Sequence, residues 1–224
     1  MDLSALILTA IEKRANDPHR RYIGASSIGQ PCARAIWYGY HGAPSTDFSP
    51  TIRATFDVGK KLEELMLDYV ELAGLEIVRP HVLNHWLFCG DKEVPVFQGH
   101  ADALLAMPDG SKAILEIKTA KNSRFQGFKK NGLKEWAPGY YSQLQAYMGM
   151  RGLQKSVLLA INKDTSELHH EWIEFDSYHY NELRAKAHMI STADEPPDRI
   201  NKSPLYHVCA RCNYKDTCFF GEKP

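Results

Sequence analysis

The chain has 224 residues, of which 44% are hydrophobic, and its 27 basic side chains balance 27 acidic ones. This length allows a substantial core, and the lack of a low-complexity linker or internal repeat favours one domain spanning residues 1–224. Overall neutrality argues against a protein that coats nucleic acid through its net charge. Any such binding must come from a local asymmetry of charge.

The N-terminal segment, residues 3–11, is apolar but short. It is interrupted by Ser4 and Thr9, and it follows Asp2 instead of a basic region. These features are typical of a first helix and not of a signal peptide. No stretch of the sequence is long and apolar enough to cross a membrane. We therefore expect a cytoplasmic protein with no membrane partner.

A β-hairpin is predicted in the middle of the chain. Residues 94–106 are rich in strand formers, residues 108–111 form a strong turn signal, and residues 113–119 resemble a second strand. In that second strand Glu116 and Lys118 share a face with Ile114, while the alternate residues share the other face. Charged residues in an otherwise apolar strand need partners, which suggests a site.

Two carboxylates of this hairpin can form a divalent-cation site. A loop covering residues 107–111 places Asp102 opposite Glu116, and two such carboxylates can hold a metal ion beside Lys118. A slip of one residue would put the two acids on opposite faces, so the hypothesis requires one register. The alternative is an amphipathic hairpin whose charged residues are only solvated.

The five cysteines form a second pattern. Three lie in the tail as Cys209-x2-Cys212-x5-Cys218, and Cys32 is the natural fourth ligand because it lies in a Pro-Cys turn before a helical segment. Cys89 has the setting of an ordinary core thiol. Clustered cysteines in a chain without an export signal indicate a metal or cluster rather than disulfides. Four thiolates suit either zinc or an iron–sulfur cluster, although one ligand plus three from distant segments is less typical of zinc.

These motifs together resemble a known superfamily. Asp102, Glu116-x-Lys118 and the later Gln143-x-x-x-Tyr147 are similar to the PD-(D/E)xK superfamily, and specifically to its RecB-like branch. The four cysteines narrow the resemblance to the iron–sulfur nucleases of that branch, which include the CRISPR-associated exonuclease, the AddB nuclease domain and related phage proteins. The resemblance covers most of the chain, from residue 26 to residue 218.

The resemblance implies an α/β fold with a central mixed β-sheet flanked by helices, the restriction-endonuclease-like core. It implies Mg²⁺- or Mn²⁺-dependent DNA cleavage, usually exonucleolytic on single strands or DNA ends. It also implies a structural [4Fe–4S] cluster in a lobe formed by about residues 24–40 and 203–220. The residues implied as catalytic are Asp102, Glu116, Lys118, Gln143 and Tyr147; those holding the cluster are Cys32, Cys209, Cys212 and Cys218; and those holding the metal ion are Glu63, Asp102, Glu116 and the carbonyl of Ile117.

The chain departs from the family pattern at two places. His100-Ala101 precede Asp102 where the superfamily has a proline. The branch usually carries a metal-binding histidine in a Gly-x-x-x-His setting, and the matching segment here begins at Gly59 and has Glu63 in that slot. Phage recombination exonucleases of the wider superfamily also use an acidic residue there.

The helix predicted over residues 57–73 indicates whether Glu63 is placed to bind metal in the position of the family's histidine. Its apolar residues recur at helical spacing, and Glu63 lies beside the resulting stripe on the side of Gly59. A carboxylate there suits a third metal ligand, and the alternative is a boundary glutamate that reaches to water. The expected stripe is Leu62, Leu65, Met66, Tyr69 and Val70.

A basic loop is expected directly after the second strand of the hairpin. Basic side chains offset phosphate charge, and interleaved aromatic rings can stack on unpaired bases. The alternative is a loop that is only solvated. The residues expected to contact DNA are Lys121, Arg124, Lys129, Lys130 and Trp136.

The remaining pattern completes the expected architecture. Helices are predicted over residues 140–150 and 178–192, and strands over residues 156–161 and 171–175. Without the resemblance, Gln143 could be a solvated neighbour of a core Tyr147. Two other functions remain open: a catalytically weak DNA-binding or assembly subunit, and a zinc-ribbon interaction module. Expected partners are DNA, with a helicase, recombinase or integration complex, or further copies of the chain.

Overall fold

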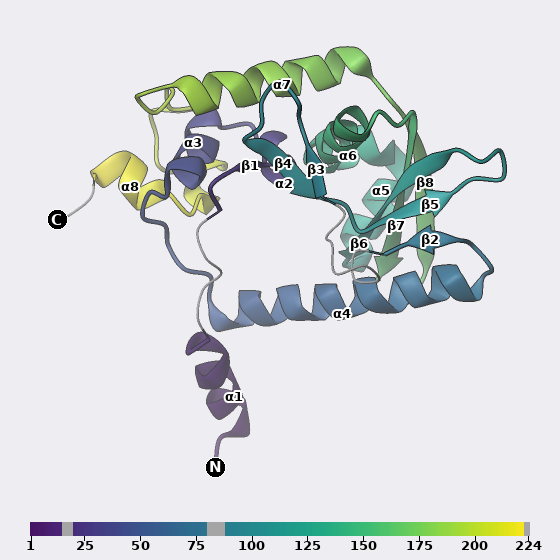
Figure 1. Ribbon diagram of the computed structural model, residues 1–224. Helices are drawn as coiled ribbons and strands as arrows, with labels where there is room; N and C mark the ends of the chain where they lie inside the picture. The colour runs from purple at the N-terminus through teal and green to yellow at the C-terminus, as the bar shows by residue number, and fades with distance from the viewer. Residues whose placement is uncertain (15–19, 80–87, 222–224) are drawn as a thin grey trace.

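The computed structural model describes residues 1–14, 20–79 and 88–221. A five-stranded mixed sheet and a smaller three-stranded sheet are flanked by helices, as Figure 1 shows. The predicted α/β class, with helices around a mixed central sheet, is thus confirmed. The structure has a second, smaller sheet in addition to the central one. The strands are β1 (Ile23–Gly24), β2 (Ile77–Val78), β3 (Phe88–Gly90), β4 (Phe97–His100), β5 (Ala103–Ala106), β6 (Lys112–Ala120), β7 (Lys155–Asn162) and β8 (Leu168–Glu174).

The larger sheet has the order β2-β5-β6-β7-β8, and the smaller one has the order β1-β4-β3. Strands β6 and β7 pair in parallel, and β5 and β8 pair antiparallel to them. The helices are α1 (Leu3–Glu12), α2 (Ala25–Ile28), α3 (Ala33–His41), α4 (Pro50–Leu72), α5 (Asn122–Trp136), α6 (Pro138–Arg151), α7 (Ser177–Thr192) and α8 (Lys215–Phe220), with the 3₁₀ turn η1 (Cys209–Arg211).

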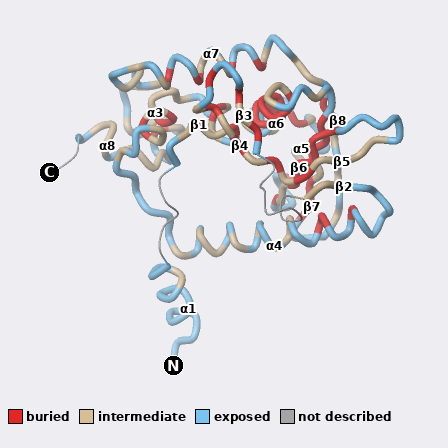
Figure 2. The backbone as a smooth tube through the Cα atoms, viewed as in Figure 1, coloured by how far each residue is buried: buried red, intermediate tan, exposed pale blue. Residues whose placement is uncertain are grey.

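The alternation of side chains along β6 divides the core in two. Ile114 packs in a cluster with residues of α5 and α6, while Leu115 and Ile117 pack in a second cluster with Met66 and Val70 of α4. Successive side chains of a strand point to opposite faces, so β6 is buried on both. The predicted division of the strand into two faces is confirmed, and Figure 2 shows the buried residues concentrated around these strands and α6.

The first strand of the predicted hairpin is broken. Residues 97–100 form β4 in the small sheet and residues 103–106 form β5 in the large one, so a single strand over residues 94–106 was wrong. The break lies at Asp102, whose Oδ2 accepts the backbone N–H of Ile117 on β6 at 2.7 Å. The side-chain oxygen of Asp102 thus takes the place of a backbone acceptor at the end of the β5–β6 ladder. The strand before Asp102, β4, pairs in the smaller sheet.

The segment expected as a basic loop is a helix, α5. Phe125 and Phe128 are fully buried one turn apart, and this packing stabilises the helix from beneath. The helix is kinked at Gly132, whose φ of 72° is open to glycine at little cost. After the kink, the Leu133 N–H donates to Glu171 of β8 at 2.8 Å. The loop prediction was wrong because apolar packing outweighs the polar composition of the segment.

Helix α4 begins at Pro50, earlier than predicted, with Ser49 as its N-cap. Its buried residues are Met66, Leu67 and Val70. Two residues of the expected stripe, Leu65 and Tyr69, are exposed instead. The buried stripe therefore turns toward Leu67, which packs with Met66 and Val70 against the larger sheet, and the outer apolar residues stay uncovered.

The segment that follows α3 contacts the C-terminal segment of the described chain. Thr46, after α3, donates its N–H to the Asn213 carbonyl at 2.8 Å, and the Thr217 hydroxyl of α8 donates to the Pro44 carbonyl at 2.6 Å. Cys89 is buried, as expected of a core thiol. Helix α1 covers the segment predicted as a first helix. Within the described residues, no helix combines the length and apolar character that crossing a bilayer requires.

Candidate active site and cysteine pocket

The carboxylate site forms where β5 meets the middle of β6. Ala103 pairs with Leu115, so the preceding residue, Asp102, lies across from Glu116. This is the register that the hairpin hypothesis requires. Glu116 is only 1% exposed, so the alternative of a merely solvated acid pair is wrong.

A chain of hydrogen bonds holds Glu116 in place. Lys118 Nζ lies 2.5 Å from Glu116 Oε1, and Gln143 Nε2 donates to the same oxygen at 2.8 Å. Gln143 Nε2 also lies 3.0 Å from the Tyr147 hydroxyl, which donates to the His100 carbonyl at 2.5 Å. Gln143 is 5% exposed and contacts Glu116, so a solvated Gln143 is excluded. The Gln-x-x-x-Tyr residues of α6 therefore tie β6 to the end of β4.

One oxygen of this cluster is left without a partner. Glu116 Oε2 is buried and accepts no hydrogen bond from the described residues. A buried, unpaired carboxylate oxygen is unfavourable, because it has lost its water and gained nothing in exchange. The sheet thus presents a buried electron-pair donor beside Asp102.

The pKa of each of the three acidic side chains is raised. Burial, followed by the charge of Asp102, raises the pKa of Glu116 to about 8. Burial and Asp102 also raise the pKa of Glu63 to about 7, and burial raises that of Asp102. Burial alone would lower the pKa of Lys118, but Glu116 and Asp102 hold it above its usual value. Negative charge is crowded here and Lys118 offsets only part of it.

Glu63 reaches this cluster from α4. Its carboxylate is half-buried, on the side of α4 that carries the buried Met66 and Val70. Gly59, one turn earlier, faces the hydroxyl of Thr119 on β6, so the helix passes close to the strand without a side chain between them. The helix that covers one face of the sheet therefore also supplies the third acid.

These residues suit a divalent cation by their chemistry. Carboxylate and carbonyl oxygens are the ligands that Mg²⁺ and Mn²⁺ prefer, and a positive ion would relieve both the crowding of charge and the unpaired Oε2 of Glu116. Among the described residues, no group of three or more His, Cys, Asp or Glu side chains is already arranged as a metal site. Binding would thus require some of the acidic side chains to turn toward one ion.

The predicted DNA-binding residues lie on or beside α5. Lys121 is its N-cap, and Lys129 forms an ion pair with Glu167 at 2.5 Å. Arg124 lies over the ring of Trp136, which stacks on the buried Phe128. Lys130 is exposed. Only Trp136 among the aromatic residues of α5 is positioned near the surface, so the interleaved-aromatic pattern mostly reports packing.

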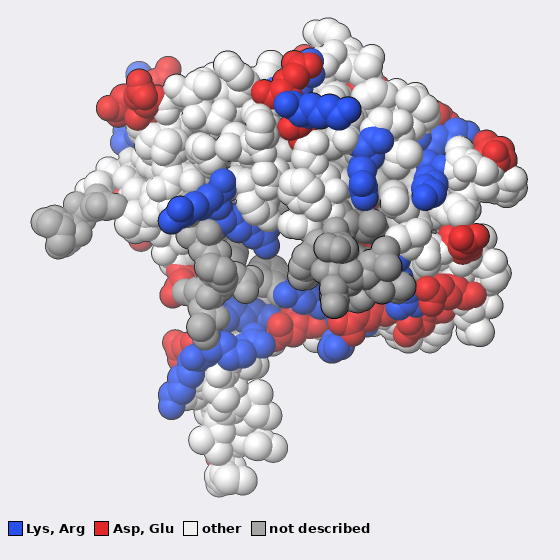
Figure 3. All heavy atoms as spheres, viewed as in Figure 1, with Lys and Arg blue, Asp and Glu red and all other residues white. Residues whose placement is uncertain are grey.

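A basic groove lies at the N-terminal half of α4. It has a volume of about 620 Å³, and its lining includes the basic residues Arg14, Arg20, Arg53 and Lys60. Figure 3 shows Lys and Arg side chains gathered on this face around the junction of α1 and α4. Lys60, which lines the groove, lies three residues before Glu63 on the same helix. The sequence pattern did not single out this groove, because its residues are spread over three segments.

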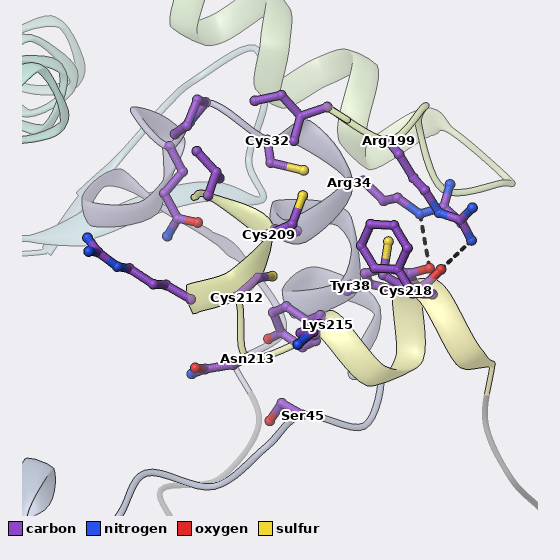
Figure 4. A pocket seen from close by; sticks show the side chains of 18 of the residues that line it. Cys32, Arg34, Tyr38, Ser45, Arg199, Cys209, Cys212, Asn213, Lys215 and Cys218 are labelled. Carbon is purple, nitrogen blue, oxygen red and sulfur yellow. Dashed lines mark hydrogen bonds between the residues drawn. The ribbon is translucent and has the colours of Figure 1, made fainter. Parts of the chain in front are cut away.

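A second pocket, of about 860 Å³, gathers the four predicted cysteine ligands from both ends of the chain. Figure 4 shows the sulfurs of Cys32 and Cys209 facing one another. Cys212 directly follows the 3₁₀ turn that contains Cys209, and Cys218 lies on α8. Burial raises the pKa of Cys209 and of Cys212, and the neighbouring cysteines raise both further. Four thiols that crowd one another in this way suit a thiolate-bound metal or cluster, which would hold them deprotonated.

Basic side chains surround the cysteine pocket. Arg199 donates to the Cys218 carbonyl, and Lys186 Nζ donates to the carbonyls of Ile28 and Gln30, just before Cys32. These bonds place positive charge at the rim of the cysteine pocket. Burial lowers the pKa of Lys186, while Cys32 acts in the opposite direction.

The fold is shared with exonucleases of known structure. No protein-family model matches the sequence, and no curated protein matches it. The alkaline exonuclease LHK-Exo from Laribacter hongkongensis superposes with a TM-score of 0.58 at 15% identity, covering 77% of this chain and 87% of that one. The protein SSO0001 has a TM-score of 0.58 at 17% identity and covers 99% of this chain and 98% of its own.

A phage-related exonuclease from Haemophilus somnus 129PT gives a TM-score of 0.54 at 13% identity, covering 75% of this chain and 91% of its own. The chain therefore has the fold of alkaline and phage-related exonucleases, as the PD-(D/E)xK resemblance implied. Membership of the iron–sulfur, RecB-like branch stays a prediction.

Sequence reasoning missed one residue that contacts the site. Lys118 Nζ lies over the ring of Tyr140, 5.2 Å from its centroid. The signal was present, because Tyr140 precedes Gln143 by three residues and so falls on the same stripe of α6.

Proposed function

We propose that the protein is a divalent-metal-dependent deoxyribonuclease, which hydrolyses phosphodiester bonds at single strands or DNA ends during recombination, repair or processing. The buried Glu116, with one unpaired oxygen beside Asp102 and Lys118, is the observation that supports this most strongly. The fold shared with two exonucleases adds support. The structure of LHK-Exo in complex with dAMP superposes with a TM-score of 0.59, so a nucleotide-binding protein shares this architecture.

In this proposal Asp102, Glu116 and Glu63, with the carbonyl of Ile117, hold Mg²⁺ or Mn²⁺. When bound, such an ion supplies positive charge to the scissile phosphate and acidifies the attacking water. Glu116 enters this role already oriented by Gln143, which Tyr147 holds in turn. The position of Glu116 is thus set before any ligand arrives.

Lys118 has a separate role. Its ammonium lies beside Glu116 and stays protonated, because the carboxylates hold its pKa above the usual value. It is placed to orient the attacking water or to stabilise the charge that develops on the phosphate oxygens. A protonated lysine cannot act as the general base, so another group must accept the proton of the attacking water.

The cysteine pocket is proposed to hold a [4Fe–4S] cluster, with zinc as the alternative. Its ligands would be Cys32, Cys209, Cys212 and Cys218, which together line one cavity. The surrounding Arg and Lys side chains suit a cluster with net negative charge. Its role would be to join the two ends of the chain, far from the carboxylates.

The test compares wild type with Asp102→Ala on end-labelled single- and double-stranded DNA, with Mg²⁺, Mn²⁺ or EDTA. Metal-dependent cleavage by wild type only is expected, and the product ladder reports end preference. Asp109→Asn is the matched control, because it removes a charge from the same hairpin at an exposed turn. Normal cleavage by Asp102→Ala would reject the site. Absence of cleavage by folded wild type would favour a DNA-binding subunit.

A further inference from the structure

Three residues of α6 form a stripe that runs out of the carboxylate site. Tyr147, Gln143 and Tyr140 are spaced by four and three residues, so they lie along one face of the helix. Their exposed fractions rise along it, from 2% at Tyr147 through 5% at Gln143 to 37% at Tyr140. Tyr147 and Gln143 are tied to Glu116 and β4. Tyr140 is therefore the outermost residue of the stripe, at the mouth of the site.

The ring of Tyr140 is held by its neighbours but not buried by them. Lys118 Nζ lies 5.2 Å from its centroid, and the ring of Trp136 lies 6.0 Å away, tilted by 59°. Among the described residues, the Tyr140 hydroxyl has no hydrogen-bond partner. A tyrosine needed only to cover Lys118 would bury its ring. Tyr140 instead keeps 37% of its residue surface open to solvent.

Trp136 extends this arrangement away from the site. Its indole stacks on Phe128 with the rings 4.9 Å apart and 21° from parallel, so the buried Phe128 fixes its orientation. The guanidinium of Arg124 lies 5.1 Å from the Trp136 ring. The resulting row, Lys118, Tyr140, Trp136 and Arg124, alternates two cations with two aromatic rings along the edge of the site. We call it the aromatic row.

Such a row matches the chemistry of unpaired nucleotides. Cations offset phosphate charge, and aromatic faces stack on bases of any sequence, because every base has a π-face. A base within a duplex is already stacked on both sides and paired, so it does not reach an isolated ring at the mouth of a site. Only an unpaired, unstacked base can lie against such a ring.

We propose that Tyr140 is the stacking platform for an unpaired base of the DNA strand whose phosphate lies at Lys118. Tyr140 thereby selects unpaired nucleotides over duplex, without regard to base identity, and Trp136 and Arg124 support the ring and the next phosphate. This inference rests on the proposed nuclease function, and it names the residue that determines the substrate class. Tyr140 touches the substrate base and takes no part in proton transfer.

The experiment measures stacking without cleavage. Full-length protein carrying Glu116→Gln is titrated into single-stranded and duplex oligonucleotides with 2-aminopurine near one end, since stacking on an aromatic ring quenches that base. Three variants are compared in this background. Tyr140→Phe keeps the ring, Tyr140→Leu keeps an apolar side chain without the ring, and Tyr178→Leu removes a tyrosine that is 74% exposed on α7. Tyr140→Met replaces the leucine variant if that one fails to fold.

We expect quenching and affinity for single strands to persist in Tyr140→Phe and Tyr178→Leu. Tyr140→Leu should lose the quenching and weaken single-strand binding by roughly 5- to 100-fold, the range for one base–aromatic stack. Its duplex binding should change by less than about twofold, since that binding depends on phosphate contacts. Equal weakening on both substrates, unchanged quenching, or no single-strand binding by the parent protein would each overturn the inference.

The two proposals fail separately. If wild type, with Glu116 intact, shows no metal-dependent cleavage while the quenching follows the expected pattern, the nuclease proposal fails and the platform stands as a binding site. If wild type cleaves DNA and Tyr140→Leu retains the single-strand to duplex ratio of cleavage rates, the platform fails and the nuclease stands.

Discussion

The carboxylate site and the cysteine pocket are built in different ways. The carboxylates lie at the centre of the larger sheet, where β6 is buried on both faces by α4 and by α5 and α6. The cysteines come from the two ends of the described chain, and within residues 203–220 only Cys209 is buried. Two hydrogen bonds hold the first site: Gln143 donates to Glu116, and Asp102 accepts the N–H of Ile117. The cysteine pocket is instead formed by short helices around a cavity, without a core of its own.

This difference predicts which of the two proposed ligands would matter for structure. Glu116 lies in a close-packed core. This core can hold the acidic side chains near one another against their repulsion. Around the cysteines, little apolar area holds the tail, so a bound cluster would supply the missing cross-links. Loss of a ligand should therefore change activity at the first site and structure at the second.

Replacing Lys118 by Ala should have the largest effect on cleavage. We expect the rate to fall by roughly 10²- to 10³-fold, the usual loss when one preorganised charge-stabilising group is removed. The melting temperature should fall as well, because the buried Glu116 loses the ammonium that offsets part of its charge. Rates under single-turnover conditions and thermal melts check this. Lys112→Ala, on an exposed residue of the same strand, is the control, and an equal loss there would contradict the assignment.

Among these variants, one that lacks the Cys209 thiol should lose the most stability, because residues 203–220 should unfold. Cys209→Ser should abolish the broad absorbance near ~400 nm expected of iron–sulfur charge transfer, and it should expose residues 203–220 to protease. A loss of about 2–4 kcal/mol corresponds to a fall in melting temperature of roughly 5–15 °C for a chain of this size. Absorbance, iron content and limited proteolysis are the measurements.

The fifth cysteine provides the control for that experiment. Cys89 is buried near the carboxylate site and does not line the cysteine pocket. Cys89→Ala should keep both the absorbance and the protected tail. Zinc in place of iron, with no colour in anaerobic wild type, would replace the cluster proposal by the zinc alternative.

The raised pKa values of the acids predict a pH dependence. Their folded pKa values, about 7 for Glu63 and about 8 for Glu116, lie above the unfolded values. Their contribution to stability is therefore present below pH ~4.5 and is lost as pH rises through 7 and 8. Without metal, the free energy of unfolding should fall between pH 5 and 8, while metal-dependent cleavage should rise as the acids deprotonate.

Glu63→Gln sharpens that prediction. It removes one repelling charge, so metal-free protein at pH 8 should gain about 1 kcal/mol, after discounting for the partial exposure of Glu63. Metal affinity should weaken in the same variant, as isothermal titration with Mn²⁺ can measure. Chemical denaturation at pH 5 and pH 8 tests the first effect. A variant less stable than wild type at pH 8 would show that Glu63 is stabilised, and not strained, by its neighbours.

The smallest effect concerns the basic helix. Arg124→Gln should weaken DNA binding a few-fold and reduce the slope of log affinity against log salt by about 1, because one phosphate contact is lost. Lys155→Gln, an exposed residue at the start of β7, should leave the slope unchanged. Fluorescence anisotropy at several salt concentrations distinguishes the two. An unchanged slope in Arg124→Gln would remove α5 from the DNA interface.

Much of the carboxylate site could be predicted from the sequence, because its parts are close in the chain. The Asp102–Glu116 register follows from the length of one turn, and the positions of Glu116 and Lys118 on one face follow from strand geometry. The four cysteines were assigned to one site by their spacing and the resemblance, and the structure places them around one cavity. Their ligand stays a prediction.

Only the tertiary structure decided how distant elements approach one another. The helical state of residues 122–136 depends on burial of Phe125 and Phe128 beneath α5, and composition alone suggested a loop. The contact of Gln143 with Glu116 and the exposure of Tyr140 depend on where α6 crosses the sheet. Local patterns specify backbone periodicity and short-range register, whereas the docking of one element on another is set by packing that no short segment contains.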